Sequence, residues 1–586
     1  MKGVLFDSIL LDFHTLFESD SKLSLGGYEM VVHKEVKWDA VTDVVVLGSG
    51  GAALTSAILA SDQGAGVMIL EKAEQVGGTT AFSGGIPWIP MNRYMKELGV
   101  SDSKEEAKQL ITHLTGGKEP DPVLIDVFID NGWKMIDYLY EHTPVRFAVP
   151  KGYGDYYADL PGGKNEGRSL DPLPFSLNEL GEWADKVRRN PIFPPLTLEE
   201  GGASDPGELD FNIVAERMEK NITTMGRALA GSLFKAVLDR GIETLIETPG
   251  KELVMNEAGE VIGVRAERDG RDFYVGARKG VVIATGGFEW NKELVASFLK
   301  GRVTHPQSPA TNEGDGLIMA MEAGAGLANM GEAWWSPAFV DPTIEYEGRV
   351  YNMIDSQART MANSIIVNSH GKRFANEGST YMDFPKSFYA YDQVTQTLPN
   401  EPPVWLIFDQ QLKDRALIVT MAPGEPAPDW VDQANSIREL AEKIGVDPEG
   451  LEETVAKFNK YAVNAEDPEF HRGTLHFEKF ATRFAGPQAN IGPIEKAPFY
   501  ALPIYYGTLG TNGGPRINEH GQVISLRGEV IPGLYSAGNV AMGILGPAYP
   551  GAGGTIGPAL TFGYLAGLHA GNVPARKINE DLSTTV

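Results

Sequence analysis

The sequence predicts an α/β protein in which a Rossmann-like domain, built from two distant parts of the chain, carries an inserted α+β domain. Three observations predict this fold. An apolar strand, a glycine-rich turn and a helix follow one another near residue 48. Glycine makes up 68 of 586 residues, well above its usual share of about 7%. These glycines gather near both ends of the chain. Because glycine is needed where backbone approaches a ligand closely, two such clusters indicate one ligand held from both sides.

Composition and charge narrow the class of protein. The chain has 51 basic and 78 acidic residues, a formal net charge of −27, which disfavours binding to nucleic acid or to anionic membrane surfaces. It has no cysteine, which excludes disulfides, thiol catalysis, iron–sulfur clusters and cysteine-ligated zinc. The N-terminus does not resemble a signal peptide, and glycine and proline interrupt the long uncharged runs. We therefore expect a cytoplasmic protein with no metal, no nucleic-acid partner and no integral membrane span.

The first glycine cluster has the form of a dinucleotide-binding unit. Residues 44–47 are an apolar, β-branched run typical of a buried parallel strand. The glycines after it permit a tight turn and close approach of a pyrophosphate, and the following helix offers its N-terminus to the phosphate charge. A second strand at 66–70 ends at an acidic residue, placed where a ribose-binding carboxylate belongs. The contacts predicted from this unit are Gly48, Gly50, Gly51, Ala52 and Glu71.

A second loop, rich in glycine, threonine and serine, follows at 77–85. It resembles the loop that wraps the pyrophosphate and reaches toward the flavin in the FAD-binding subunits of the fumarate reductase and 3-ketosteroid dehydrogenase superfamily. Segments 281–288, 314–316 and 531–539 resemble that superfamily in the same order. The resemblance implies FAD and a fumarate reductase flavoprotein-like fold. The further cofactor contacts that it implies are Lys72, Gly78, Thr79, Thr80, Ser83, Gly84, Gly85, Thr285, Gly286, Asp315, Gly538, Asn539, Gly554 and Thr555.

The C-terminal glycine cluster, residues 546–566, is very similar to the signature of 3-ketosteroid Δ1-dehydrogenases. Segment 509–514 resembles their Gly-Thr-Lys-Gly-Gly segment, with Asn512 where lysine is usual. Fumarate reductases carry an arginine for the substrate carboxylate in this cluster, and its absence here argues against a dicarboxylate substrate. The resemblance extends over nearly all of the chain from about residue 39.

Four catalytic residues are implied by this resemblance. The family's base is a tyrosine that matches Tyr381, and a second tyrosine that assists it is aligned with Tyr156, with Tyr153 and Tyr157 as alternatives. The hydroxyl of Tyr549 and the backbone N–H of Gly553 would donate to the ketone oxygen. An unperturbed tyrosine has a pKa of about 10, so the base needs help, and a hydrogen bond from Tyr156 to Tyr381 is expected to supply it.

The implied reaction is FAD-dependent 1,2-desaturation of a 3-ketosteroid, with proton loss beside the ketone, hydride transfer to the flavin and an external electron acceptor. Three alternatives stay open: a Δ4-dehydrogenase or a dehydrogenase of another cyclic ketone, a fumarate reductase-like enoate reductase, and a flavin-binding protein without activity. The expected domains are an N-terminal extension (1–38), a discontinuous FAD-binding domain (39–337 and 508–586) and an inserted catalytic domain (338–507). Within the insert, residues 365–377 are expected to form a strand, a turn and a return strand.

Overall fold

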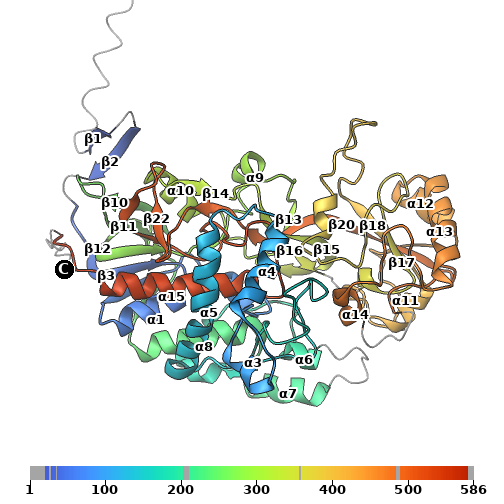
Figure 1. The fold of residues 1–586 in the computed structure, drawn as a ribbon, viewed down its shortest axis with the longest axis horizontal. Helices are drawn as coiled ribbons and strands as arrows, with labels where there is room; N and C mark the ends of the chain where they lie inside the picture. The colour runs from blue at the N-terminus through green and yellow to red at the C-terminus, as the bar shows by residue number, and fades with distance from the viewer. Residues whose placement is uncertain are drawn as a thin grey trace, which may run out of the picture.

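The computed structural model describes residues 20–25, 28–33, 36–201, 210–354, 358–482 and 489–578. Most of the expected N-terminal extension lies outside the described residues. Within it, β1 (Asp20–Leu25) and β2 (Tyr28–His33) form an antiparallel pair. The division into domains stays a prediction, but the rest of the described chain builds two large sheets (Figure 1).

The first sheet has eight strands in the order β10-β11-β12-β3-β4-β9, with β23 paired to β12 and β22 to β23. Strands β9, β4, β3, β12 and β23 pair with one another in parallel, with Val46 opposite both Ile69 and Val282. Strands β10, β11 and β22 pair antiparallel to their neighbours. Residues 44–47 are fully buried, because helices and other segments cover both faces of this parallel sheet. The strands are β3 (Ala40–Leu47), β4 (Val67–Leu70), β9 (Glu243–Leu245), β10 (Gly250–Met255), β11 (Val261–Arg268), β12 (Arg271–Ile283), β22 (Gln522–Ile524) and β23 (Val530–Ser536).

Helices α1 (Gly51–Asp62) and α15 (Ile556–Asn572) lie side by side against this sheet, with α5 (Pro122–His142) and α8 (Met225–Asp239) beside them (Figure 1). Three glycines on α15, spaced four apart, face α1. A Cβ atom at Gly567 would lie 2.2 Å from the carbonyl oxygen of Ser56, and one at Gly563 would lie 2.5 Å from that of Ala52. This spacing places the glycines on one helix face. The two helices therefore pack backbone to backbone, and the two glycine clusters meet as predicted.

Shorter elements connect these helices and strands. Helix α10 (Asp315–Glu322) begins directly after Gly314, within the segment 314–316 that resembles the superfamily. The remaining elements of this part are α2 (Gly78–Phe82), α3 (Arg93–Leu98), α4 (Lys104–Thr115), α6 (Leu198–Gly201), α7 (Phe211–Glu219), α9 (Lys292–Phe298), the 3-10 helix η1 (Leu177–Lys186), and the two-residue strands β5 (Phe147–Ala148), β6 (Asp171–Pro172), β7 (Phe175–Ser176), β8 (Ile222–Thr223), β14 (Leu327–Ala328) and β21 (Gly514–Pro515).

The second sheet has seven strands in the order β16-β15-β20-β18-β17, with β13 and β19 also paired to β20. The expected domain boundaries, after residue 337 and before residue 508, fall inside the long strands β15 and β20, where Pro337 lies opposite Tyr506. The elements are β13 (His305–Pro306), β15 (Ala333–Tyr346), β16 (Arg349–Ile354), β17 (Ser364–Val367), β18 (Val404–Asp409), β19 (Asp432–Ala434), β20 (Phe499–Thr511), η3 (Ala358–Thr360), η4 (Phe384–Ser387), α11 (Gln410–Arg415), α12 (Ile437–Ile444), α13 (Pro448–Ala462) and α14 (His476–Ala481).

The prediction of a return strand after Gly371 is wrong. Strand β17 pairs with β18 instead, and residues 372–376 form no strand. The reason is visible at Ile366, whose backbone N–H donates to the Glu377 carboxylate at 3.2 Å, so that a side chain takes the place of a neighbouring strand.

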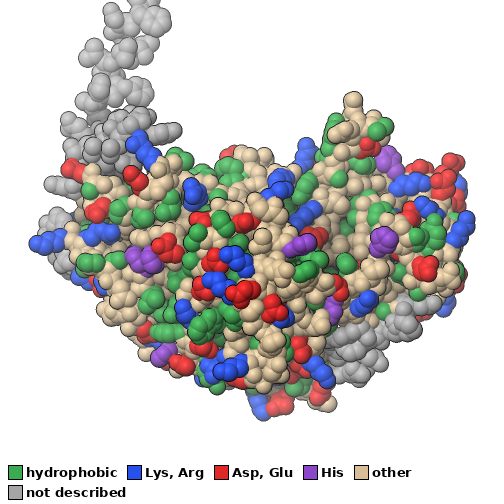
Figure 2. All heavy atoms as spheres, in the orientation of Figure 1, with side chains coloured by type: hydrophobic (Ala, Val, Ile, Leu, Met, Phe, Trp, Pro, Cys, Tyr) green, Lys and Arg blue, Asp and Glu red, His purple; other side chains and the backbone are tan. Residues whose placement is uncertain are grey.

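On the face drawn in Figure 2, Lys and Arg side chains are interspersed with Asp and Glu. Among the described helices, none combines the length and the apolar character that crossing a membrane requires.

Candidate active site

Nearly all of the predicted site residues line one cavity. It encloses about 1840 Å³ of empty space, its open mouth included, and begins where β3, β4 and β12 end. All four predicted catalytic residues line it, as do all predicted cofactor contacts except Gly554. A Cβ atom at Gly554 would meet the Tyr549 ring at 3.3 Å and Pro550 at 3.4 Å. Gly554 therefore packs behind the wall of the cavity and does not form it.

The first glycine turn opens onto the cavity at the N-terminus of α1. A Cβ atom at Gly50 would meet only the Thr80 hydroxyl, at 3.7 Å, so the space before the helix is open. The Thr80 hydroxyl accepts a hydrogen bond from the Gly51 N–H at 2.9 Å. This contact joins the two predicted loops and leaves the helix N-terminus facing a site suited to an anion.

Glu71 is buried at the end of β4. Its carboxylate accepts hydrogen bonds from the Ser49 hydroxyl at 2.5 Å and from the Ala73 N–H at 2.8 Å. Burial raises its pKa despite these donors. Ser49, which sequence reasoning missed, also accepts a hydrogen bond from the Gly77 N–H at 3.0 Å. It thus ties the acid to the second glycine loop.

The predicted contacts Lys72 and Asp315 are paired with each other. The Lys72 ammonium lies 2.9 Å from the Asp315 carboxylate and 2.5 Å from that of Glu313. Among the described residues that line the cavity, Lys72 is the only lysine or arginine. The positive charge at the cavity wall is therefore already neutralised by the protein.

A further wall residue, Asn312, was not predicted. Its amide donates to the Thr79 hydroxyl at 2.9 Å and to the buried Glu289 carboxylate at 2.8 Å. Asn312 lies two residues before the Gly-Asp-Gly motif that begins α10. Its place beside that motif is the one feature of the sequence from which a role at the cavity could have been predicted.

Three tyrosines from distant segments meet at the other end of the cavity. The Tyr156 hydroxyl donates to the Tyr381 hydroxyl at 3.0 Å. The Tyr549 ring centroid lies 5.7 Å from that of Tyr381 and 5.9 Å from that of Tyr156. Burial raises the pKa values of both Tyr156 and Tyr381 well above 10, although the hydrogen bond from Tyr156 acts to lower that of Tyr381. The walls nearby are apolar and include Ile86, Leu509 and Ala552.

Tyr156 and its two alternatives, Tyr153 and Tyr157, make different contacts. The Tyr157 hydroxyl donates to the Asp383 carboxylate and lies 3.4 Å from the Thr380 hydroxyl. Its hydrogen-bond partners are therefore Asp383 and Thr380, not Tyr381. Tyr153 lines the cavity and packs edge-on against Phe480, with ring centroids 4.8 Å apart. Tyr156 makes the hydrogen bond to Tyr381 that the assisting tyrosine is expected to make.

Gly553 presents its backbone to the same end of the cavity. Its φ is +98°, and a Cβ atom would lie 2.3 Å from the carbonyl oxygen of Ile86, so a larger residue does not fit. Its carbonyl accepts from the N–H groups of Trp88 and Gly557. Within the described part of the chain, no group accepts a hydrogen bond from its own N–H. This donor is therefore available to a ligand in the cavity.

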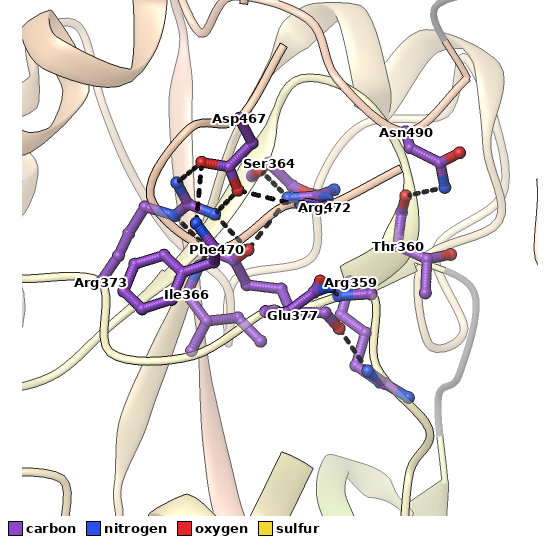
Figure 3. Close-up of polar contacts among 12 residues, drawn as sticks. Arg359, Thr360, Ser364, Ile366, Arg373, Glu377, Asp467, Phe470, Arg472 and Asn490 are labelled. Carbon is purple, nitrogen blue, oxygen red and sulfur yellow. Dashed lines mark hydrogen bonds and ion pairs between the residues drawn. The ribbon is translucent and has the colours of Figure 1, made fainter. Parts of the chain in front are cut away.

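The loop that carries Tyr381 is anchored by buried charges (Figure 3). Arg373 pairs with Glu377 at 2.6 Å and with Asp467 at 2.7 Å, and Arg359 donates to the backbone carbonyls of Glu377 and Ser379. Burial opposes ionisation of Glu377, but the Arg373 guanidinium holds its pKa below the usual value. This network fixes the backbone two to four residues before Tyr381.

Comparison with known proteins identifies the family. Residues 43–556 match the family model described as an FAD binding domain. A 3-oxosteroid 1-dehydrogenase of Mycobacterium tuberculosis is 36% identical over 563 residues, 90% of this chain and 98% of the relative. The chain belongs to the 3-ketosteroid Δ1-dehydrogenase family of FAD flavoproteins. A second family relative, 4-oxocyclohexanecarboxylate 2-dehydrogenase of Sinomonas cyclohexanicum, is 37% identical over 536 residues, 90% of this chain and 92% of the relative.

The fold of this flavoprotein family agrees with solved structures. The 3-ketosteroid Δ1-dehydrogenase of Sterolibacterium denitrificans, in complex with 1,4-androstadiene-3,17-dione, superposes with a TM-score of 0.84 at 30% identity, covering 91% of this chain and 99% of that one. A flavocytochrome c3 fumarate reductase superposes with a TM-score of 0.63 at 21% identity, covering 91% of this chain and 78% of that one, which shows the shared fold.

The residues at the glycine-lined end of the cavity fit FAD. The Thr285 Oγ1 atom is buried, has no hydrogen-bond partner among the described residues, and belongs to a residue that lines the cavity. The open space before α1 suits a pyrophosphate, and the Glu71 carboxylate suits a ribose. The predicted FAD contacts of this flavoprotein therefore lie in the same cavity as its three tyrosines.

Proposed function

We propose that this flavoprotein desaturates a ring ketone next to its carbonyl group, with 1,2-dehydrogenation of a 3-ketosteroid as its main reaction. One observation carries the proposal: Tyr381, Tyr156, Tyr549 and the unpartnered Gly553 N–H line the same cavity as the FAD contacts. The family relatives named 3-oxosteroid 1-dehydrogenase support it.

Two donors act on the ketone oxygen in this proposal. The proton beside a ketone is weakly acidic unless the enolate that forms is stabilised. The Tyr549 hydroxyl and the Gly553 N–H donate to the oxygen as negative charge develops there, and a single such donor contributes about 10²–10³-fold to the rate. Glycine is required at position 553 because Ile86 and Trp88 leave no room for a side chain.

Tyr381, as the tyrosinate, accepts the proton from the carbon next to the carbonyl and becomes neutral. Before this transfer, Tyr156 stabilises the negative charge on the Tyr381 oxygen by donating a hydrogen bond to it. FAD, when bound, supplies the acceptor for the hydride that leaves the neighbouring carbon, and an external electron acceptor removes the electrons. The substrate thus loses one proton and one hydride, and a carbon–carbon double bond forms. The protein's share is to orient the ketone, exclude water and hold the proton.

The chemistry of the wall favours an apolar substrate. The lining residues Ile86, Leu509 and Ala552 pack in one hydrophobic cluster with the three tyrosines. Lys72, the one lysine or arginine among the described lining residues, is paired with Glu313 and Asp315. Burying a carboxylate without a cation is costly. A steroid, which is apolar around its ketone, therefore suits this site better than a dicarboxylate does.

The test is anaerobic mixing of the flavin-loaded protein with a 4-ene-3-ketosteroid. We expect the visible flavin band to bleach and the 1,4-diene-3-one to form. A product with a new 4,5 double bond from a saturated ketosteroid would indicate the Δ4 reaction instead, and turnover of fumarate with no ketone oxidation would contradict the proposal.

A second candidate substrate is a monocyclic ketone acid. It is favoured by the relative named 4-oxocyclohexanecarboxylate 2-dehydrogenase, which is 37% identical to this chain. The same donors and base would serve this ring, and the two substrates are distinguished by comparing kcat/KM for each.

A further inference from the structure

The peptide that joins Ala552 to Gly553 is hydrogen-bonded on its carbonyl side by a buried serine. The Ser169 hydroxyl donates to the Ala552 carbonyl oxygen at 2.9 Å, and Ser169 is 1% exposed. The N–H of the same peptide is the one assigned above to the substrate's ketone oxygen. We propose that Ser169 is a positioning residue, which orients and polarises this peptide so that its N–H stabilises the enolate. The inference rests on the proposed function.

The physical reason lies in the resonance of the peptide group. A donor at the carbonyl oxygen draws electron density from the nitrogen, so the N–H becomes a stronger donor. Chains of hydrogen bonds strengthen one another in this way by about 10–30% per bond. The effect is useful here because the Gly553 N–H has no acceptor among the described residues and is free to act on a ligand.

Ser169 is held in place by the ion pairs of its neighbour. The Arg168 guanidinium contacts Asp102 at 2.6 Å and Asp155 at 2.8 Å, and these side chains are at most 1% exposed. The backbone on both sides of Ser169 also pairs with residues 87–89, through the Arg168 carbonyl and the Leu170 N–H. The hydroxyl is therefore presented to Ala552 from a rigid segment.

Trp88 links this segment to both halves of the site. Its backbone N–H donates to the Gly553 carbonyl at 3.1 Å, and its indole N–H donates to the Asp155 carboxylate at 2.7 Å. Asp155 directly precedes Tyr156, whose own N–H donates to the Pro550 carbonyl at 2.9 Å. The Ala552–Gly553 peptide and the Tyr156–Tyr381 pair are thus both attached to the buried segment around Trp88 and Asp155. This common attachment fixes the distance between them.

The experiment compares Ser169→Ala with Ser169→Thr, which keeps the hydroxyl, in the flavin-loaded full chain. If polarisation contributes about 10–30% of a donor worth about 10²–10³-fold, the alanine variant should reduce the flavin about two- to eightfold more slowly at saturating ketone. The threonine variant should recover the lost rate. Ser232→Ala is the matched control, because Ser232 is also buried and donates to a backbone carbonyl, that of Leu229 at 3.0 Å, within helix α8.

A second measurement reports on polarisation directly. The infrared carbonyl stretch of bound 1,4-androstadiene-3,17-dione should move to higher frequency in Ser169→Ala and return in Ser169→Thr, because a weaker donor polarises the ketone less. An unchanged frequency in the alanine variant, or an equal loss of rate in Ser232→Ala, would overturn the role of Ser169. Failure of the wild-type protein to oxidise any ring ketone would instead overturn the proposed function.

Discussion

The Tyr156 hydroxyl donates to the Tyr381 hydroxyl across 3.0 Å, although 225 positions of sequence separate the two residues. This bond favours the tyrosinate form of Tyr381, whereas burial opposes it and raises the pKa of Tyr381 well above 10. The cavity offers no unpaired lysine or arginine among its described lining residues. The proposed base is therefore mostly protonated at neutral pH.

A pH dependence follows from this protonation. Because the pKa of Tyr381 is raised, the fraction of tyrosinate grows about tenfold for each pH unit below that pKa. We expect the rate of flavin reduction by a ketosteroid to rise with a slope near one between pH 6 and pH 9, measured by anaerobic stopped-flow. A plateau near neutral pH would show that Tyr381 is not the group that accepts the proton.

Replacing Tyr156 by phenylalanine removes the donor to Tyr381. A hydrogen bond to a charged group contributes about 1.5–3 kcal/mol, so flavin reduction in Tyr156→Phe should slow about 10- to 100-fold. Tyr157→Phe is the matched control, since the Tyr157 hydroxyl bonds to Asp383 and not to Tyr381. Equal losses in the two variants would contradict the assignment of Tyr156.

Tyr549→Phe removes one of the two proposed donors to the ketone oxygen. We expect flavin reduction to slow about 10²–10³-fold. The dissociation constant for the steroid should change much less, because the donor acts mainly on the charge that develops in the transition state. Titration of the flavin spectrum with the dienone product gives the affinity, and a variant that keeps the wild-type rate would rule out this role.

The uncharged wall near the tyrosines predicts selectivity against acids. We expect the methyl ester of 4-oxocyclohexanecarboxylate to be oxidised with a kcat/KM at least about tenfold above that of the free acid, since the acid would bury its charge without a partner. Initial rates with an artificial electron acceptor measure both. A preference for the free acid would indicate a cation near the substrate and would favour the monocyclic ketone acid as the main substrate.

The contact between α1 and α15 predicts a stability effect. A Cβ atom at Gly567 would lie 2.2 Å from the Ser56 carbonyl oxygen, so Gly567→Ala should destabilise the protein by about 1–3 kcal/mol. Flavin retention should fall with it, because α1 begins at the proposed pyrophosphate site. In the control, Gly201→Ala, the new Cβ meets only Leu196 at 3.8 Å. Denaturant unfolding and flavin release measure both, and an unchanged Gly567→Ala variant would contradict the close packing.

Local patterns made one half of the site predictable. The β3–α1–β4 unit follows from an apolar run, three glycines and a terminal acid, all within 28 residues from Val44 to Glu71. Short-range sterics and helix geometry determine such a unit, so the sequence alone places its residues on the cavity.

Long-range contacts made the other half harder to predict. The choice among Tyr153, Tyr156 and Tyr157 depends on which hydroxyl reaches Tyr381, a contact between segments that the sequence does not relate. The same applies to Ser169, whose partner Ala552 is 383 positions away. The expected return strand after Gly371 failed because the Glu377 side chain, held by Arg373, occupies the edge of β17.

The packing of α1 against α15 has a consequence for biosynthesis. Helix α1 ends at Asp62, whereas α15 ends at Asn572, so the ribosome must synthesise all of the intervening chain before the two helices can touch. Strand β23 must also join β12 from this late part. Helix α1 and strand β12 therefore remain incompletely covered until α15 and β23 have been synthesised. The proposed FAD site therefore has both of its glycine-rich walls only after α15 has been synthesised, so complete enclosure of the cofactor must follow that step in the maturation of this enzyme.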